Sequence, residues 1–229
     1  MKVTWLGQAG LLFETKYITI MVDPYLSDSC GETNPKSKRR VPVDEKVFGI
    51  KPDIIILTHD HLDHTDEQTL AHFLGEDSEV TVLASKNSWT HVRSVFGGNN
   101  NYVMFNNGTV WSQDGIEFTA VRAEHSDDYA IGVIIDDGIK KYYVTGDTLY
   151  NKSIFADIPS DIDTVFMPIN GVGNNMNVTD AIHFAEMINA KHSVPLHFGL
   201  FDSLNPEEFT ASNRVIPEFF REIELEKCI

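Results

Sequence analysis

The chain has 229 residues, of which 42% are hydrophobic and 23% are charged, as in ordinary globular domains, so it is not a disordered or fibrous sequence. Its length predicts a single domain over 1–229 that needs neither disulfides nor a structural metal to fold. With 18 basic and 34 acidic residues the net charge is −16, which argues against nucleic-acid and membrane partners.

The first half predicts strands followed by strand–helix units. Three runs rich in β-branched and aromatic residues predict consecutive hairpin strands at Lys2–Leu6, Leu11–Glu14 and Tyr17–Val22. The segment from Ser27 to Ile50 has no periodicity and is expected to be a long loop. Buried strands are then expected at Asp53–Leu57 and Val80–Ala84, with a helix that begins at Thr65–Asp66 and another over Ser85–Phe96.

The second half repeats this order. Strands are expected at Val103–Phe105, Gly115–Arg122, Tyr129–Ile135 and Lys141–Thr145, with a tight hairpin at Asp136-Asp137-Gly138. Strands at Thr164–Met167 and Ser193–Leu196 then alternate with helices at Thr179–Asn189 and from Pro206 to Ser212. The repeated order predicts an α/β (α+β) fold in which two sheets pack face to face with helices outside, a four-layer αββα sandwich.

Cysteine content and hydropathy bear on the compartment. Cys30 and Cys228 are too few for a disulfide framework and lack Cys-x-x-Cys spacing, which favours a reducing compartment. The N-terminus shows no signal-peptide pattern, and the apolar runs are too short to cross a bilayer. We therefore expect a cytoplasmic protein.

One segment concentrates the chemistry. His59, His61, Asp63 and His64 lie within six residues, directly after the expected strand at 53–57. A polar turn with ordinary histidines is the alternative, but so many imidazoles and acids need partners that a core does not supply. We expect the turn to direct them to two points about 3.5 Å apart, the spacing of two-metal sites.

Two metals need further ligands, and candidates follow other strands. His125 comes just after the strand at 115–122, Asp147 after the strand at 141–145, and His197 after the strand at 193–196. Each is expected at the rim of a sheet, where irregular loops converge.

The order His59-x-His61-x-Asp63-His64, His125, Asp147, His197 resembles the metallo-β-lactamase superfamily of αββα binuclear hydrolases. Segments 5–10, 23–25, 58–61, 145–148 and 168–185 are similar to its L-ascorbate-6-phosphate lactonase-like branch and to related metal-dependent hydrolases. The resemblance implies one metal on His59, His61 and His125, a second on Asp63, His64 and His197, and Asp147 as the bridge. Oxygen-reducing di-iron relatives carry an acid in place of His61, so the resemblance implies hydrolysis.

The ligand set also bears on the metal and the mechanism. Seven nitrogen and oxygen ligands without a thiolate suit Mn²⁺, Zn²⁺ or Fe²⁺, and the lactonase-like branch implies manganese. A water between two divalent ions loses its proton near neutral pH and becomes the nucleophile. The expected catalytic residues are Asp63, which orients this hydroxide and later returns a proton, and His197.

Weaker candidates surround these ligands. Asp23 is either a turn carboxylate or an acid that orients a ligand imidazole. Substrate contacts are expected from Gln8, Asn170 and Asn174, although a Gly-rich hairpin and a helix-entry loop are the alternatives. Arg39 and Arg40 are candidates for binding a substrate phosphate.

These features predict a metal-dependent hydrolase of a small, anionic, ester-like substrate, for example a phosphorylated sugar lactone. An anionic substrate is compatible with the net charge because the metals leave the cleft locally positive and remote charges are screened. Two alternatives stay open: a phosphodiesterase of the same superfamily, and a non-catalytic metal-binding sensor or scaffold. A homo-oligomer also stays open.

Overall fold

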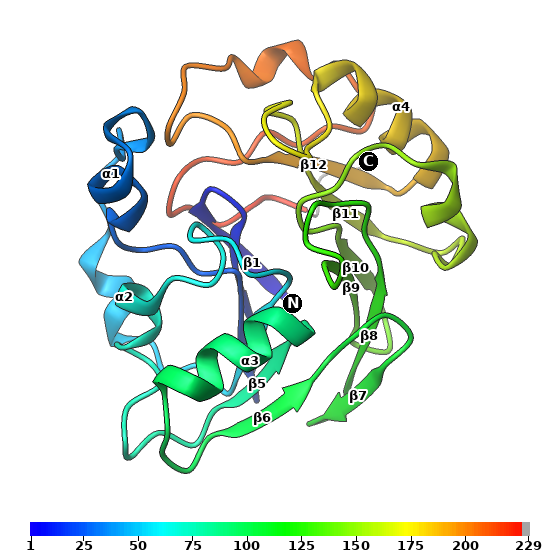
Figure 1. Cartoon of the computed structure of the whole chain (residues 1–229). Coiled ribbons are helices and arrows are strands. Elements are labelled where there is room, and N and C mark those ends of the chain that lie inside the picture. Colours follow the sequence, from blue (N-terminus) through cyan, green and yellow to red (C-terminus); the bar gives the residue numbers. More distant parts are fainter. Residues whose placement is uncertain (226–229) are drawn as a thin grey trace.

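Two six-stranded sheets pack face to face in the computed structural model, which describes residues 1–225 (Figure 1). The first sheet contains, in spatial order, β1 (Lys2–Gly7), β2 (Gly10–Glu14), β3 (Thr19–Val22), β4 (Ile54–Leu57), β5 (Thr81–Ala84) and β6 (Asn101–Met104). The second contains β12 (His192–Leu196), β11 (Thr164–Pro168), β10 (Lys141–Val144), β9 (Ile131–Asp136), β8 (Ile116–Arg122) and β7 (Val110–Gln113). With helices on the outer faces, the predicted four-layer sandwich is confirmed.

Both sheets change from antiparallel to parallel pairing across their width. β1, β2 and β3 pair antiparallel, as predicted for successive hairpin strands, and β3 to β6 pair parallel. In the second sheet β7 to β10 are antiparallel and β10 to β12 are parallel. The predicted hairpin at 136–138 joins β9 to β10.

Strand β4 shows how the sequence fills both faces of the first sheet. Ile54 and Ile56 belong to the core between the sheets, whereas Ile55 and Leu57 belong to the core under the outer helices. All four side chains are fully buried, and burying each contributes about 1.5–3 kcal/mol. The strand is held from both sides, so the chain that leaves it starts from a fixed point.

Helices cover the outer faces at the expected places. Near the first sheet lie α2 (Glu67–Leu70), which begins after the N-cap Asp66, and α3 (Lys86–Val95), which begins after Ser85. Near the second sheet lies α4 (Val178–Ile188), which ends at Asn189 in the left-handed conformation. No helix among residues 1–225 is long and apolar enough to span a bilayer.

Two predicted elements were wrong, and one strand was missed. The expected loop at 27–50 contains short helical turns: α1 (Ser29–Thr33), η1 (Pro35–Ser37) and η2 (Glu45–Gly49). The expected helix from Pro206 to Ser212 is only the 3₁₀ turn η4 (Pro206–Glu208), and β7 was not predicted. A further 3₁₀ turn, η3, spans Lys152–Ala156. Cys228 lies outside the described residues.

Candidate metal centre

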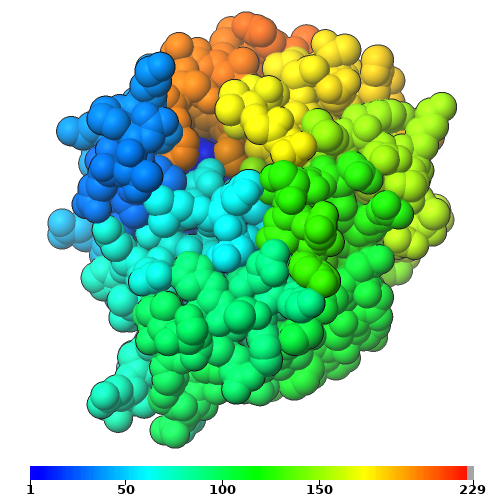
Figure 2. Space-filling model, viewed as in Figure 1, coloured from blue at the N-terminus to red at the C-terminus, as the bar shows by residue number. Residues whose placement is uncertain are grey.

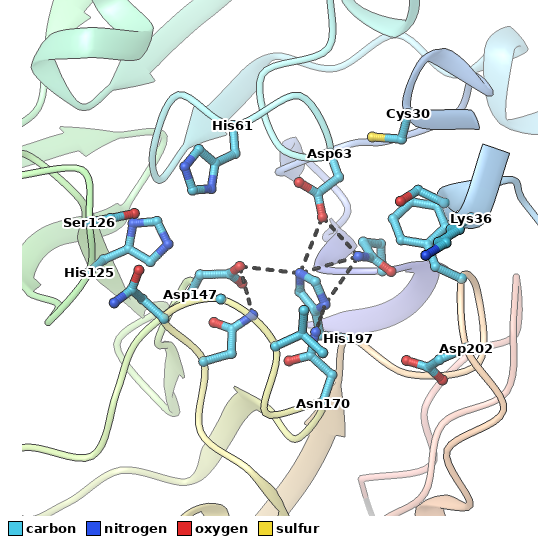
Figure 3. A pocket seen from close by; sticks show the side chains of 17 residues that line it. Cys30, Lys36, His61, Asp63, His125, Ser126, Asp147, Asn170, His197 and Asp202 are labelled. Carbon is cyan, nitrogen blue, oxygen red and sulfur yellow. Dashed lines mark hydrogen bonds and ion pairs between the residues drawn. The ribbon is translucent and has the colours of Figure 1, made fainter. Parts of the chain in front are cut away.

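The candidate ligands converge at one edge of the sandwich, between the two sheets. His59, His61, Asp63 and His64 follow β4, His125 follows β8, Asp147 follows β10, and His197 follows β12. Figure 3 shows His61 and His125 on one side of the cavity, with Asp63, Asp147 and His197 near its middle. The structure therefore brings together all seven residues that the sequence singled out as ligands.

The first group, here called the His cluster, consists of His59, His61 and His125. One ring nitrogen from each lies within 4.8 Å of the others, close enough to share an ion. Burial and the neighbouring imidazole of His64 lower the pKa of His59 well below its usual value, and burial lowers that of His125. These two imidazoles are therefore neutral at pH 7, the form that binds a metal.

The second group, here called the Asp–His cluster, consists of Asp63, His64 and His197, again with one ligand atom from each within 4.8 Å of the others. Asp147 lies beside it: its Oδ1 is 3.4 Å from His64 Nε2, and its Oδ2 is 3.2 Å from His197 Nε2. Burial alone lowers the pKa of His197, but Asp147 and Asp63 outweigh it and raise that pKa to about 9. This cluster is therefore rich in negative charge and attracts cations.

Asp23 serves both clusters from beneath. Its Oδ2 is 2.8 Å from His64 Nδ1, and its carboxylate also accepts from the backbone N–H and the hydroxyl of Thr58. The Thr58 oxygen lies 3.1 Å from His59 Nδ1. Asp23 thus orients His64 directly and His59 through Thr58, so that each ring directs Nε2 toward the centre. These contacts are the ones that an acid orienting ligand imidazoles would make.

The chemistry of the buried atoms tests whether metals fit here. Within residues 1–225, His59 Nε2, His64 Nε2 and Asp147 Oδ1 are buried and form no hydrogen bond, although His64 Nε2 and Asp147 Oδ1 face each other at 3.4 Å. Leaving such atoms unpaired costs about 1–3 kcal/mol each, so native proteins rarely do so without a ligand. All three are good ligands for a divalent cation. The donor set fits a metal centre.

Backbone bonds between the sheets fix the position of the centre. Ile131 N–H donates to Thr58 O at 3.1 Å, and His197 N–H donates to Gln8 O at 3.0 Å. Gly146 lies at this seam with φ +62°, and a Cβ there would come within 2.6 Å of Ile131 O. Only glycine fits that approach, and Asp147 follows it directly in the chain.

Three residues around the centre have a strained backbone. Gln8, Asp23 and His197 have φ values of 52°, 42° and 63°, which non-glycine residues rarely adopt. Each costs of order 1–3 kcal/mol and persists because surrounding contacts hold it. The free-energy cost of these conformations is accepted at the positions that surround the candidate ligands, which indicates a functional rather than a stabilising role for this local structure.

The clusters lie at the base of a cavity of about 430 Å³. Its opening is a hollow in Figure 2 where segments near residues 30, 60 and 200 meet. The predicted substrate-contact residues Gln8, Asn170 and Asn174 all line it. Gln8 Nε2 donates to Asp63 Oδ2 at 2.8 Å, and Asn170 Nδ2 lies 2.9 Å from His197 Nδ1.

The structure does not place the two predicted arginines in this cavity. Arg39 is held by the backbone, because its guanidinium donates to Tyr25 O and Val41 O, and Arg40 is exposed outside the cavity. The cavity is instead lined by Lys36 from the same segment. The basic residues at 36–40 correctly indicated that this segment supplies a cation to the cavity. Which of them faces the cavity depends on tertiary contacts that the sequence does not reveal.

Of the other lining residues, Asn175 had a signal in the sequence, its place in the polar loop after the expected strand at 164–167, whereas Cys30, Ser37, Phe201 and Asp202 had none. Asn175 Nδ2 donates to Asp147 Oδ2 at 2.8 Å, and Cys30, Ser37, Phe201 and Asp202 complete part of the wall. Burial raises the pKa of Cys30 to about 11, so it is a neutral thiol at pH 7. It adds no charge to the cavity.

Comparison with known proteins agrees with the fold. A family model described as "Beta-lactamase superfamily domain" matches residues 19–198. A UPF0173 metal-dependent hydrolase of Thermoplasma acidophilum is 30% identical, over 98% of this chain and 99% of that protein, and a UPF0173 protein of Pyrococcus furiosus is 29% identical, over 91% and 89%. A crystal structure described as a metal-dependent hydrolase from Parabacteroides distasonis has a TM-score of 0.70 and 24% identity, over 96% of this chain and 93% of that one.

The superfamily resemblance noted from the motifs is thereby confirmed, whereas none of these relatives supports the ascorbate-6-phosphate lactonase branch. The match to the family model includes the segment that carries all seven candidate ligands. The chain belongs to the UPF0173 metal-dependent hydrolase family of the metallo-β-lactamase superfamily.

Proposed function

We propose that this protein hydrolyses a small, anionic, ester-like substrate with two divalent ions, and that a lactone is one such substrate. The observation that carries the proposal is the pair of ligand clusters, with Asp147 beside them, at the base of an open cavity. The His cluster would hold one ion and the Asp–His cluster the other. Mn²⁺ or Zn²⁺ suits this nitrogen and oxygen set, and Fe²⁺ is also compatible.

A pair of divalent ions, when bound, supplies an acidic water and an electrophile for the carbonyl or phosphoryl oxygen of the substrate. The side chains of the protein would transfer the proton and hold the reacting groups in position. Asp63 lines the cavity and accepts from Gln8 at Oδ2. Its Oδ1 would accept the proton that the attacking water loses and donate that proton to the leaving oxygen. His197 is held between Asp63 and Asp147, at 3.3 and 3.2 Å, and fixes the position of both carboxylates.

The amides above the centre suit a polar, oxygen-rich substrate. Among residues 1–225, the Oδ1 atoms of Asn170 and Asn175 are buried without hydrogen-bond partners, and both residues line the cavity. They would accept hydrogen bonds from hydroxyl groups of the substrate. Serine or cysteine nucleophiles are not required, and Cys30, a neutral thiol, does not take that role.

The test combines metal analysis with a substrate screen. We expect purified protein to contain about two equivalents of Mn²⁺, Zn²⁺ or Fe²⁺ per chain and to hydrolyse members of a panel of lactones, carboxylic esters and thioesters. Phosphodiesters in the same panel distinguish a phosphodiesterase. Metal at this stoichiometry with no turnover of any member would contradict hydrolysis and favour a sensor or scaffold.

A further inference from the structure

We infer that Lys36 binds an anionic group of the substrate, a carboxylate or a phosphate, away from the bond that is hydrolysed. The inference rests on the proposed function, since it assigns the substrate class for the same cavity. Figure 3 shows Lys36 on the side of the cavity opposite His61 and His125, with Asp63 and His197 between them. In a substrate that reaches from the ligand clusters to Lys36, the anionic group lies at the end opposite the bond that is hydrolysed.

Lys36 is the only lysine or arginine among the described residues that line this cavity. No carboxylate within residues 1–225 forms an ion pair with its ammonium group. In a chain with a net charge of −16, a cation that faces a cavity without an acidic partner is available for an external anion. The neighbouring cations do not compete, because Arg39 is held by backbone carbonyls and neither Lys38 nor Arg40 lines the cavity.

The backbone around Lys36 is anchored, so its position is built into the fold. The side chain of Asn34 accepts from Lys36 N–H at 3.2 Å and caps the 3₁₀ turn that begins at Pro35. Asp28 Oδ1 accepts from Arg39 N–H at 2.8 Å and closes the same segment from the other side. The lysine therefore projects from a fixed turn, which limits the entropy lost when an anion binds.

Asp202 lines the same part of the cavity and sets the charge of the group that fits. Its Oδ1 accepts from the backbone N–H groups of Gly199 and Leu204, both at 2.9 Å, so the carboxylate is fixed in a turn. One ammonium and one fixed carboxylate accommodate a single anionic group and disfavour a densely charged polyanion. This agrees with the argument from net charge against nucleic-acid substrates.

Binding of matched small acids to the Zn²⁺-loaded protein tests the inference without any turnover. Succinate and adipate carry two carboxylates, whereas butyrate and hexanoate have the same chain lengths and only one. We expect calorimetry to show that at least one diacid binds about tenfold or more tightly than its monoacid, and that Lys36→Ala removes this preference. 3-Phosphonopropionate, compared with succinate, shows whether phosphate or carboxylate is preferred.

Lys38→Ala is the matched control, because Lys38 is an exposed lysine two residues away that does not line the cavity. It should leave the preference for diacids unchanged, and Lys36→Arg should retain part of it. Equal affinities of diacids and monoacids for the wild-type protein, or equal losses in the Lys36→Ala and Lys38→Ala variants, would overturn the inference.

A kinetic arm separates this inference from the proposed function. 4-Nitrophenyl hemisuccinate and 4-nitrophenyl butyrate share a leaving group and differ in one carboxylate. We expect Lys36→Ala to raise KM for the hemisuccinate by about tenfold and to leave kcat/KM for the butyrate unchanged. If both esters are hydrolysed and Lys36→Ala affects them equally, the role of Lys36 is refuted and the proposed hydrolysis stands. If the protein prefers diacids through Lys36 but hydrolyses no substrate, the proposed hydrolysis is refuted and the role of Lys36 stands.

Discussion

The His cluster and the Asp–His cluster offer a metal different sets of ligands in different electrostatic surroundings. The His cluster uses three imidazoles, and burial keeps two of them, His59 and His125, neutral. Burial lowers the pKa of both imidazoles of the Asp–His cluster, but the surrounding carboxylates outweigh it and raise the pKa of His64 and of His197. Two imidazoles of the His cluster are neutral in the folded chain, whereas a metal that binds the Asp–His cluster would have to displace protons.

This difference shows how one loop can supply two unlike sites. The loop gives its first two ligands, His59 and His61, to the His cluster and its last two, Asp63 and His64, to the Asp–His cluster. Each cluster is completed by a residue that follows a strand of the second sheet. Asp23 contacts His64 directly and His59 through Thr58, and the charge of Asp147 acts on imidazoles of both clusters. Substitutions at these positions test how far the two halves depend on each other.

The largest effect is expected from Asp147→Ala. Asp147 is buried beside the Asp–His cluster, and its charge also reaches His59 and His125. We expect kcat/KM to fall by more than about 1,000-fold, equivalent to about 4 kcal/mol of transition-state stabilisation. Metal analysis by mass spectrometry should show fewer than two ions per chain. Retention of both ions would mean that the clusters are independent.

Asp23→Asn should weaken both clusters, but less severely. The amide keeps the size of the side chain and loses the charge that orients His64 directly and His59 through Thr58. We expect metal affinity to fall by about 10–100-fold, measured by competition with a chelator of known affinity. An effect confined to one of two resolved binding steps would show that Thr58 does not transmit the orientation.

Thr58→Val should act on the His cluster alone. Valine keeps the shape of the buried threonine but lacks the hydroxyl that lies 3.1 Å from His59 Nδ1. His64 keeps its direct contact with Asp23. We expect about a tenfold loss in one binding step and little change in the other, with Thr58→Ser as the control that retains the hydroxyl. Equal loss in both steps would contradict the separation of the clusters.

The smallest effect is expected outside both clusters, at His91 on α3. His91 Nδ1 lies 2.6 Å from Asp60 and Nε2 lies 2.8 Å from Glu67, which braces the ligand loop against the helix. Burial lowers the pKa of His91, but Glu67 and Asp60 outweigh it and raise that pKa above its usual value. Its stabilising contribution is therefore complete below the unfolded value of about 6.5 and is lost as pH rises through the folded value.

Urea unfolding of metal-free protein at several pH values checks this expectation. His91→Gln should lower the free energy of unfolding below pH 6.5 and should have a smaller effect at higher pH. The metal ligands titrate in both proteins, so they cancel in the difference. A loss of stability that is independent of pH would show that the ring acts through packing alone.

The sequence predicted the sheets and the ligands better than it predicted the walls of the cavity. Continuous apolar runs such as Ile54–Leu57 identify buried strands, and a dense His/Asp motif after such a strand has few structural alternatives. The edge strand Val110–Gln113 was missed because it is only half-buried and lacks a strong apolar pattern. Short turns such as Pro35–Ser37 have no helical periodicity to detect.

Roles that depend on long-range contacts could not be predicted. Lys36 and Arg39 belong to one basic run, and only the capture of Arg39 by Tyr25 O and Val41 O separates their roles. Thr58 gave no signal beyond its place next to His59, since its role depends on Asp23, 35 positions earlier in the chain.

The seam between the sheets also sets when the centre can form during synthesis. The first sheet ends at Met104, whereas His125, Asp147 and His197 all come later in the chain. A nascent chain that has folded only its N-terminal half carries four ligands and completes neither cluster. The two ions of the proposed function would therefore be bound tightly only by the finished molecule, and metal content would report how many chains in a preparation have matured.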